Sequence, residues 1–354
     1  MNGAGAAPRT AGVAGVDADA VSGWIATLDV GEAAPLQFAR LGRGQSNLTY
    51  LVSDAHEQRW VLRRPPLGHL LDSAHDVVRE HRVLRALQQT QVPAPAVYGL
   101  CQDTAVSDVP LLLMEHVNGL VVDDMAIAES LEPALRGAIG RSLARTLATI
   151  HAVDLEQTGL DSIATHAPYA ARQLKRWRAQ WEHSRSRELP IIEQLAERLQ
   201  AAIPEPGELT LVHGDFHLLN VIISPLDGGV RAVLDWELCT LGDPLADVGT
   251  LMAYWPERDA PDIAIGMPAN LAPGFPTRAE LAGRYAEASG RDLSELDFFL
   301  ALGYWKLAII LEGVYARYAA GGYGEAGAAD SGFEAFARLV ERLAETAEAT
   351  ESRD

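Results

Sequence analysis

The chain has 354 residues, 48% of them hydrophobic, and a formal net charge of −19 from 29 Lys and Arg against 48 Asp and Glu. This length predicts two domains or lobes with a sizeable core. The acidic balance argues against a nucleic-acid partner, because phosphate binding needs a basic surface. A membrane span is not expected either, since no run of about 18 uncharged apolar residues occurs.

The N-terminal residues 1–15 are predicted to form a disordered leader. They are rich in Gly and Ala and lack the basic stretch followed by an apolar core that is typical of a secretory signal. The two cysteines, Cys101 and Cys239, have the spacing of neither a metal site nor a redox motif. We therefore expect a cytoplasmic protein.

Residues 16–117 predict a small lobe that contains an antiparallel sheet. Helices are expected at Ala18–Leu28, opened by Asp17 or Asp19, and at Asp76–Leu87, where apolar residues recur at helical spacing. Alternating apolar residues predict the strands. These lie within Leu36–Val52, where they flank the turn GRGQSN, and at Arg59–Arg63, Val97–Leu100 and Pro110–Val117.

Residues 118–348 predict a larger, mainly helical lobe. The expected helices are Leu131–Ile150, Tyr169–His183, Ile191–Ile203, Asp243–Tyr254, Arg278–Ser289, Leu293–Ala319 and Gly332–Ala347. Short strands are expected at Leu209–Val212, Asn220–Ile223 and Arg231–Leu234. The predicted fold class is therefore α+β, with two lobes.

The densest polar cluster on an apolar background is LVHGDFHLLN, residues 211–220. A strand leads into Asp215, Asn220 follows five residues later, and Asp235 ends another strand in VLDWE. Asp and Asn oxygens suit Mg²⁺, and an Asp that binds no metal can orient and deprotonate a hydroxyl. A base Asp, a metal Asn and a second metal Asp are the groups used in kinase-type phosphoryl transfer.

The motif HGDFHLLNVI followed by AVLDWELCTLGDPLADVG resembles the aminoglycoside phosphotransferase family, which is related to choline kinase and to protein kinases. GQSNLTYLV, WVLRRPP and ILEGVYARY make the chain similar to the kinase-like domain fused to certain long-chain acyl-CoA dehydrogenases and to its free-standing bacterial relatives. The resemblance covers about residues 35–345. It implies a bilobal protein-kinase-like fold with a nucleotide-binding lobe at 16–117, a catalytic and acceptor-binding lobe at 118–348, and ATP and Mg²⁺ as cofactors.

The resemblance implies that Asp215 is the catalytic residue and that Asn220 and Asp235 are the Mg²⁺ ligands. His213 matches a residue that braces the catalytic loop. Asp243 and Asp247 match acids after the metal site, with Asp243 as a helix N-cap and Asp247 holding the catalytic loop.

The nucleotide-binding residues follow from the same resemblance. Glu80 matches the helix acid that pairs with a phosphate-binding cation, and Glu115, His116 and Val117 match the hinge that receives the adenine ring. Kinases use a Lys as that cation, but this chain has no Lys before Lys175. Its place is taken by Arg63, which strand alternation puts on the face opposite to Arg64.

The turn from Gly42 to Asn47 is expected to cover the phosphates, with Gly44 and Ser46 as the binding residues. The function implied is transfer of the γ-phosphate of ATP to a hydroxyl of a small molecule. The acceptor stays open between an aminoglycoside and a hydroxylated acyl thioester of the hydroxyacyl-CoA type. No nucleic-acid or membrane partner is expected.

Two other interpretations remain. A nucleotide-binding pseudokinase that regulates a partner would explain Arg63 but not the complete set of Asp215, Asn220 and Asp235. A metal-dependent hydrolase could use His213, Asp215 and His217, because alternate strand residues share a face, but it would leave Asn220 and Asp235 unexplained.

Overall fold

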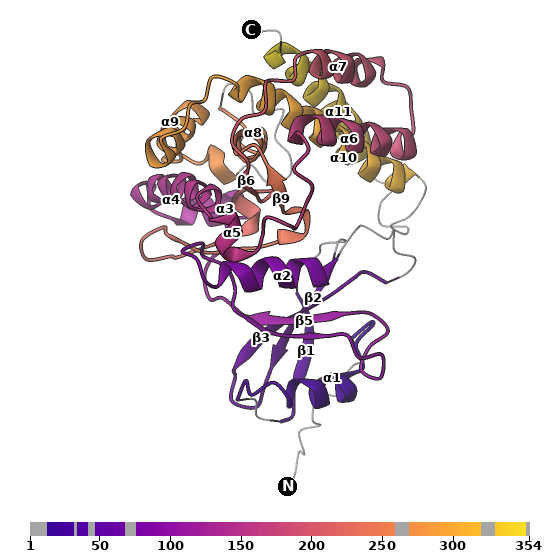
Figure 1. Ribbon diagram of the computed structural model, residues 1–354, viewed down its shortest axis with the longest axis vertical. Helices are drawn as coiled ribbons and strands as arrows, with labels where there is room; N and C mark the ends of the chain where they lie inside the picture. The colour runs from indigo at the N-terminus through magenta and orange to yellow at the C-terminus, as the bar shows by residue number, and fades with distance from the viewer. Residues whose placement is uncertain are drawn as a thin grey trace. The chain divides into compact units, whose positions relative to one another are not determined.

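The computed structural model describes residues 13–31, 34–41, 47–67, 76–258, 269–319 and 330–351 (Figure 1). It divides into two compact units. Unit 1 comprises Met1–Gln89, Ala94–Asn118 and Asp235–Glu237, and unit 2 comprises Thr90–Pro93, Gly119–Leu234 and Leu238–Asp354. The division after Asn118 lies one residue from the boundary expected from the sequence, but Asp235–Glu237 belongs with the N-terminal residues.

Unit 1 is built on a five-stranded antiparallel sheet with the strand order β1-β2-β3-β5-β4. Its strands are β1 (Gln37–Leu41), β2 (Leu48–Ser53), β3 (Arg59–Arg64), β4 (Val97–Cys101) and β5 (Leu111–Glu115). Strand β3 is central and pairs Arg63 with Thr49 on one side and with Leu112 on the other. The predicted strands are all present, and their ends differ by few residues.

The two helices of unit 1 lie on opposite sides of this sheet (Figure 1). Helix α1 (Ala18–Ile25) packs Val21 and Ile25 against an apolar cluster of sheet residues, and Asp17 caps it by accepting the N–H groups of Asp19 and Ala20. Helix α2 (Val77–Leu87) packs on β4 and β5 and is capped by Asp76. Helix α1 ends three residues earlier than predicted.

Residues 13–15, the end of the predicted leader, lie in the described part of the chain and contact the sheet. The Tyr50 hydroxyl donates to the Ala14 carbonyl at 2.6 Å, and Arg64 Nη1 donates to the Gly15 carbonyl. Residues 1–12 lie outside the described part of the chain. Two buried side chains of the sheet therefore hold the segment that precedes α1.

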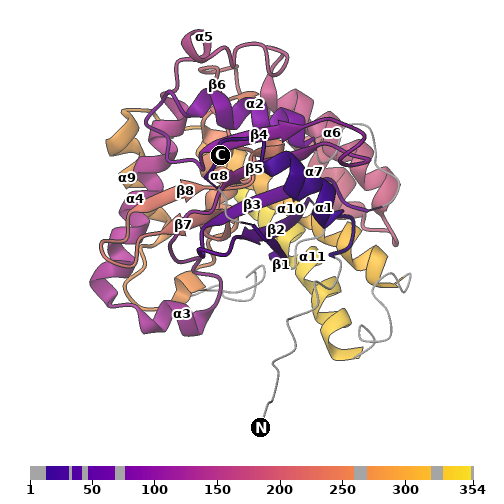
Figure 2. The ribbon, with the colours of Figure 1, turned by 90° about the horizontal axis from the view of Figure 1, so that it is seen from below.

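Unit 2 contains most of the helices. They are α3 (Met125–Ser130), α4 (Pro133–His151), α5 (Leu155–Thr158), α6 (Tyr169–Ser184), α7 (Pro190–Ala201), α8 (Leu245–Ala253), α9 (Arg278–Ser289), α10 (Leu296–Ala319) and α11 (Asp330–Glu351). Helices α10 and α11 lie side by side in both views (Figures 1 and 2), and α10 also packs on α6 and α8.

Helix α10 is the core helix of unit 2. By length and composition alone its stretch Leu296–Ala316 could cross a membrane, but 72% of its most apolar part is buried inside the protein. Trp305 is fully buried against α7, where its indole N–H donates to the Ile192 carbonyl at 3.0 Å. This burial is what a core helix requires.

Two short strand pairs in unit 2 carry the polar motif. Strand β6 (Thr210–Val212) pairs with β9 (Thr240–Gly242), and β7 (Val221–Ile223) pairs with β8 (Val230–Val233), both antiparallel. Strand β9 and helices α3 and α5 were not predicted, because such short elements carry too little periodicity to be recognised.

Candidate active site

The turn after β6 presents Asp215 and is held mainly by side chains. Asp247 on α8 accepts the N–H of His213 at 2.7 Å and that of Gly214 at 2.8 Å, one on each carboxylate oxygen. Gly214 has a φ of +84°, and a Cβ there would lie 2.6 Å from the Leu238 carbonyl oxygen. The turn therefore requires glycine at this position.

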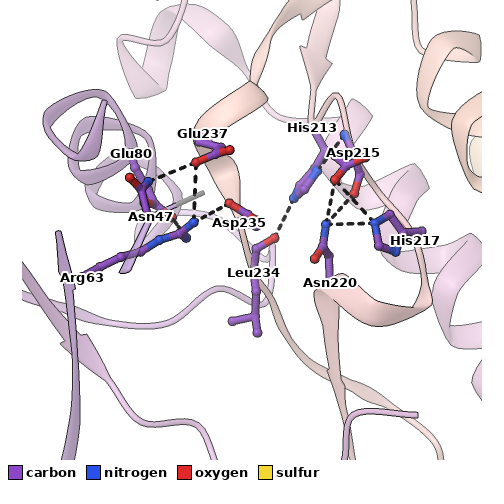
Figure 3. Close-up of polar contacts among 10 residues, drawn as sticks. All are labelled: Asn47, Arg63, Glu80, His213, Asp215, His217, Asn220, Leu234, Asp235 and Glu237. Carbon is purple, nitrogen blue, oxygen red and sulfur yellow. Dashed lines mark hydrogen bonds and ion pairs between the residues drawn. The ribbon is translucent and has the colours of Figure 1, made fainter. Parts of the chain in front are cut away.

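His213 spans the turn with both ring nitrogens. Its Nδ1 accepts the N–H of Asp215 at 3.2 Å, so the proton is on Nε2, which donates to the Leu234 carbonyl at 2.9 Å (Figure 3). Leu234 is the residue before Asp235. These are the contacts expected of a residue that braces the loop.

Asn220 turns its amide nitrogen towards Asp215. Nδ2 donates to the Asp215 carbonyl at 2.9 Å and lies 3.2 Å from Asp215 Oδ2 (Figure 3). The amide oxygen Oδ1 makes no hydrogen bond within the described residues. This orientation leaves a neutral oxygen ligand available, the kind that Mg²⁺ accepts.

Two further residues contact Asp215 that the motif did not predict in this role. His217 Nδ1 accepts the N–H of Leu219 at 3.3 Å, and its Nε2 lies 3.4 Å from Asp215 Oδ2. The His217 ring stacks on Tyr254 with the centroids 4.1 Å apart. Burial, and then the charge of Asp215 and a hydrogen bond with it, raise the pKa of the Tyr254 phenol. In the sequence, the position of His217 two residues after Asp215 was the local feature that could have indicated its contact with Asp215.

The Asp215 carboxylate remains ionised. Burial alone would raise its pKa, but the nearby His217, Lys306 and His213 hold the pKa of this carboxyl well below its usual range. An ionised carboxylate can accept a hydrogen bond from an incoming hydroxyl and orient its oxygen.

In unit 1, Arg63 is surrounded by carboxylates. Its guanidinium lies 2.5 Å from Glu80 Oε1, 2.6 Å from Asp235 Oδ1 and 3.7 Å from Glu237 Oε2 (Figure 3). Although burial would lower it, these three charges raise the pKa of Arg63 further above its usual value. Arg64 points to the opposite face, towards Gly15 and Asp108, as strand alternation predicted.

The segment after Asp235 adds one residue that sequence reasoning missed, Glu237, which contacts Asn47. Asp235 has a φ of +67°, a left-handed conformation that costs about 1–3 kcal/mol for residues other than glycine and that gathers at functional sites. Asn47 Nδ2 donates to Glu237 Oε2 at 3.0 Å. Glu237 thereby connects the end of the predicted phosphate-covering turn to the segment that carries Asp235.

The remaining nucleotide-binding predictions are only partly described. Gly44 and Ser46 lie outside the described residues. Glu115 ends β5, and its Oε2 accepts the Ala96 N–H at 3.1 Å. His116 Nδ1 is buried with no hydrogen-bond partner, and within the described part of the chain the backbone of Val117 makes no hydrogen bond either. These are groups that a bound base could use.

The two acids after Asp235 occupy different places. Asp247 is fully buried and contacts His151 Nε2 at 3.3 Å, while His151 Nδ1 contacts the Tyr285 hydroxyl at 2.8 Å. Asp243 stands one residue before the N-cap position, which Pro244 occupies, yet its Oδ1 accepts the Leu245 N–H at 2.9 Å. Asp243 therefore supports the start of α8 without touching the catalytic turn.

The contacts of His213 do not support the metal-hydrolase interpretation. Both His213 ring nitrogens are engaged within the protein, and the described residues contain no group of three or more His, Cys, Asp or Glu that could hold a metal ion. Asn220 in unit 2 and Asp235 in unit 1 each carry a side-chain oxygen of the kind that Mg²⁺ accepts. Asp235 keeps Oδ2 without a hydrogen bond among the described residues.

Comparisons with known proteins show the family. The profile of the phosphotransferase enzyme family matches residues 37–299. The human protein named acyl-CoA dehydrogenase family member 11 is 37% identical over 318 residues, which are 88% of this chain and 40% of the human protein. The chain thus spans less than half the length of this curated relative. It belongs to the phosphotransferase enzyme family.

Solved structures agree on the fold. A candidate aminoglycoside phosphotransferase from Ralstonia eutropha is 32% identical and superimposes with a TM-score of 0.76, covering 94% of this chain and 98% of that one. An amicoumacin kinase in complex with AMP-PNP, Ca²⁺ and its ligand is 16% identical and has a TM-score of 0.61, and the match covers 95% of this chain and 94% of that one. At this identity the likeness shows the fold alone. The predicted α+β, kinase-like fold is confirmed.

Proposed function

We propose that this protein transfers the γ-phosphate of ATP, with Mg²⁺, to a hydroxyl group of a small molecule. The observation that carries the proposal is the arrangement of Asp215 and Asn220, in which the amide nitrogen faces the carboxylate and the amide oxygen stays available for a metal. Membership of the phosphotransferase enzyme family supports it. The amicoumacin kinase, which binds AMP-PNP and Ca²⁺, is an example of the fold with such ligands.

Asp215 carries the acid–base role. Its ionised carboxylate accepts a hydrogen bond from the acceptor hydroxyl, turns the oxygen towards the γ-phosphorus and takes the proton as the new oxygen–phosphorus bond forms and the bond to the ADP oxygen breaks. Asn220 and Asp235 would hold Mg²⁺, which neutralises charge on the phosphates. His213 and Asp247 keep the turn in place.

Unit 1 supplies the nucleotide site in this proposal. Arg63 would bind phosphate oxygens, because its guanidinium is held by Glu80 and its Nε makes no hydrogen bond within the described residues. The backbone of Val117 would receive the base.

The acceptor is a separate proposal. We favour a hydroxylated acyl thioester, because a curated relative that is 37% identical is named an acyl-CoA dehydrogenase family member. An aminoglycoside is the second candidate. The candidate aminoglycoside phosphotransferase that is 32% identical and the net charge of −19, which attracts polycations, support it.

The test is a phosphorylation screen with the purified chain, radiolabelled ATP and Mg²⁺, in which hydroxyacyl-CoA thioesters and aminoglycosides are offered separately. We expect labelled product from a thioester, product formation about 10²–10⁴-fold slower with Asp215→Asn, and loss of product when Mg²⁺ is chelated. Product from aminoglycosides alone would overturn the acceptor proposal. No product from any alcohol, with ATP bound, would overturn the enzymatic one.

One observation favours the pseudokinase interpretation. Arg63 stands where kinases have a Lys, and it is paired with Asp235, the residue that would hold the metal. A pseudokinase would show thermal stabilisation by ATP without release of ADP with any acceptor. We rank it second because Asp215, Asn220 and Asp235 are all present.

Arg63→Ala is expected to raise the apparent KM for ATP sharply, because the substitution removes the cation from the phosphates and leaves Glu80 buried without its partner. Arg63→Lys should retain part of the activity, since the charge survives while the bidentate geometry is lost. Steady-state kinetics with varied ATP measure both.

Arg64→Ala is the matched control on the opposite face of β3. Its KM for ATP should stay near that of the wild type. The free energy of unfolding should fall by about 1–3 kcal/mol, because Arg64 is buried and donates to the Gly15 and Pro65 carbonyls. A large KM change in Arg64→Ala with a silent Arg63→Ala would show that the phosphate-binding cation is on the other face.

A further inference from the structure

Lys306 is a buried amine that the proposed reaction does not use. It lies on α10, the core helix of unit 2, and is one of only two lysines in the chain. The residue is 9% exposed. Lysine is rarely buried unless a partner compensates for its lost hydration, so its partner indicates what it does.

That partner is the catalytic turn. Lys306 Nζ donates a hydrogen bond to the carbonyl of Gly214 at 2.7 Å. Gly214 is the residue directly before Asp215. The ammonium also lies 5.7 Å from the centroid of the Trp177 ring, a cation–π contact that holds it from α6. Burial lowers the pKa of Lys306, while the charges of Asp215 and Asp247 oppose that effect.

Other side chains hold the backbone N–H groups of this turn. The N–H groups of His213 and Gly214 go to Asp247, and the N–H of Asp215 goes to His213. Lys306 donates to the Gly214 carbonyl, which belongs to the same Gly214–Asp215 peptide group as the Asp215 N–H. Because Gly214 has a positive φ and no Cβ, its own backbone preferences restrict this peptide little, and the side-chain contacts must do so.

We propose that Lys306 is a positioning residue for phosphoryl transfer, which holds the Gly214 carbonyl and thereby fixes the Gly214–Asp215 peptide and the direction of the Asp215 carboxylate. The inference rests on the proposed function for its catalytic consequence, but the hold on the turn is independent of it. Lys306 and Gly214 belong to unit 2, whereas Arg63 and Val117, the proposed nucleotide-binding residues, belong to unit 1.

Lys306→Met is the main variant, because it keeps the length of the side chain and removes the donor and the charge. We expect kcat to fall about 10–100-fold with the KM for ATP unchanged. This is the range seen when a residue that orients a ligating side chain by a hydrogen bond is replaced. Lys306→Arg, which restores charge and donor, should recover part of kcat. Lys175→Met, at an exposed position on α6, is the matched control and should match the wild type.

Hydrogen exchange provides the readout that needs no activity. In Lys306→Met, amides in residues 211–220 should exchange about tenfold or more faster than in the wild type, the equivalent of one lost hydrogen bond to a charged donor, while β3 and β5 keep their rates. If Lys306→Met does not fold, Lys306→Gln replaces it with the same expectations for a neutral side chain.

Unchanged exchange in 211–220, or a rise in the KM for ATP as large as the fall in kcat, would overturn the inference. The inference would also be overturned if Lys306→Arg recovered no kcat and the amides of residues 211–220 exchanged at equal rates in all variants. A wild-type protein that phosphorylates no alcohol would overturn the proposed function instead, and the exchange measurement would still decide whether Lys306 holds the turn.

Discussion

Asp215→Asn is expected to lower kcat by about 10²–10⁴, the usual contribution of a positioned general base, while ATP binding stays nearly intact. The amide keeps the size of the side chain but can no longer take the proton from the acceptor hydroxyl. It also removes the negative charge that His217 and Lys306 face in unit 2. Single-turnover kinetics and equilibrium binding of a fluorescent ATP analogue measure the two effects separately.

Asp227→Asn is the matched control for this experiment. Asp227 is an exposed aspartate in the turn between β7 and β8 of the same unit, where its Oδ1 accepts the Gly229 N–H at 3.1 Å. An amide oxygen can accept the same hydrogen bond, so activity should not change. Turnover of Asp215→Asn within a fewfold of the wild type would remove Asp215 from its proposed role.

Asp235→Ala is expected to have the second large effect, through the metal. It deletes the main carboxylate proposed to hold Mg²⁺, so nucleotide binding should lose its dependence on Mg²⁺ and kcat should fall by about 10²–10³, the range for one preorganised electrostatic contact. Titration of Mg²⁺ against ATP binding, followed by calorimetry, measures the first effect without requiring turnover.

A second variant, Asp235→Asn, separates the metal role of this residue from its ion pair with Arg63. Asp235→Asn keeps the size of the side chain and an oxygen, but it weakens the pairing at 2.6 Å. We expect it to bind Mg²⁺ more weakly than the wild type and better than Asp235→Ala. Asp103→Ala, at an exposed position of unit 1, should titrate like the wild type. Identical Mg²⁺ curves for Asp235→Ala and the wild type would show that the metal ligand lies elsewhere.

Local patterns in the sequence were sufficient for the elements and for the central motif. The period of the apolar residues predicted helices such as Arg278–Ser289, which the structure reproduces with the same bounds. Strand alternation correctly separated Arg63 from Arg64. Each of these depends on neighbouring residues along one element, whose geometry is regular.

The supports of the catalytic turn could not be predicted in full, because they come from distant elements. Lys306 is 92 residues from Gly214 in sequence, and nothing in the apolar sequence of α10 indicates that its one Lys donates to that carbonyl. The same is true of Asn47, which is 190 residues from Glu237. Contacts of this kind depend on how helices and strands pack, which leaves no periodic signal in either segment.

The sequence by itself determined the α+β class, the kinase-like motif and the identity of the polar residues at the ends of the short strands. Tertiary structure decided that Asp235–Glu237 groups with Arg63 in unit 1, that Tyr50 and Arg64 hold residues 14 and 15, and that a buried Lys faces the catalytic turn. The physical reason is that buried charges and carbonyls must find partners wherever packing places them, and only the folded chain specifies those partners.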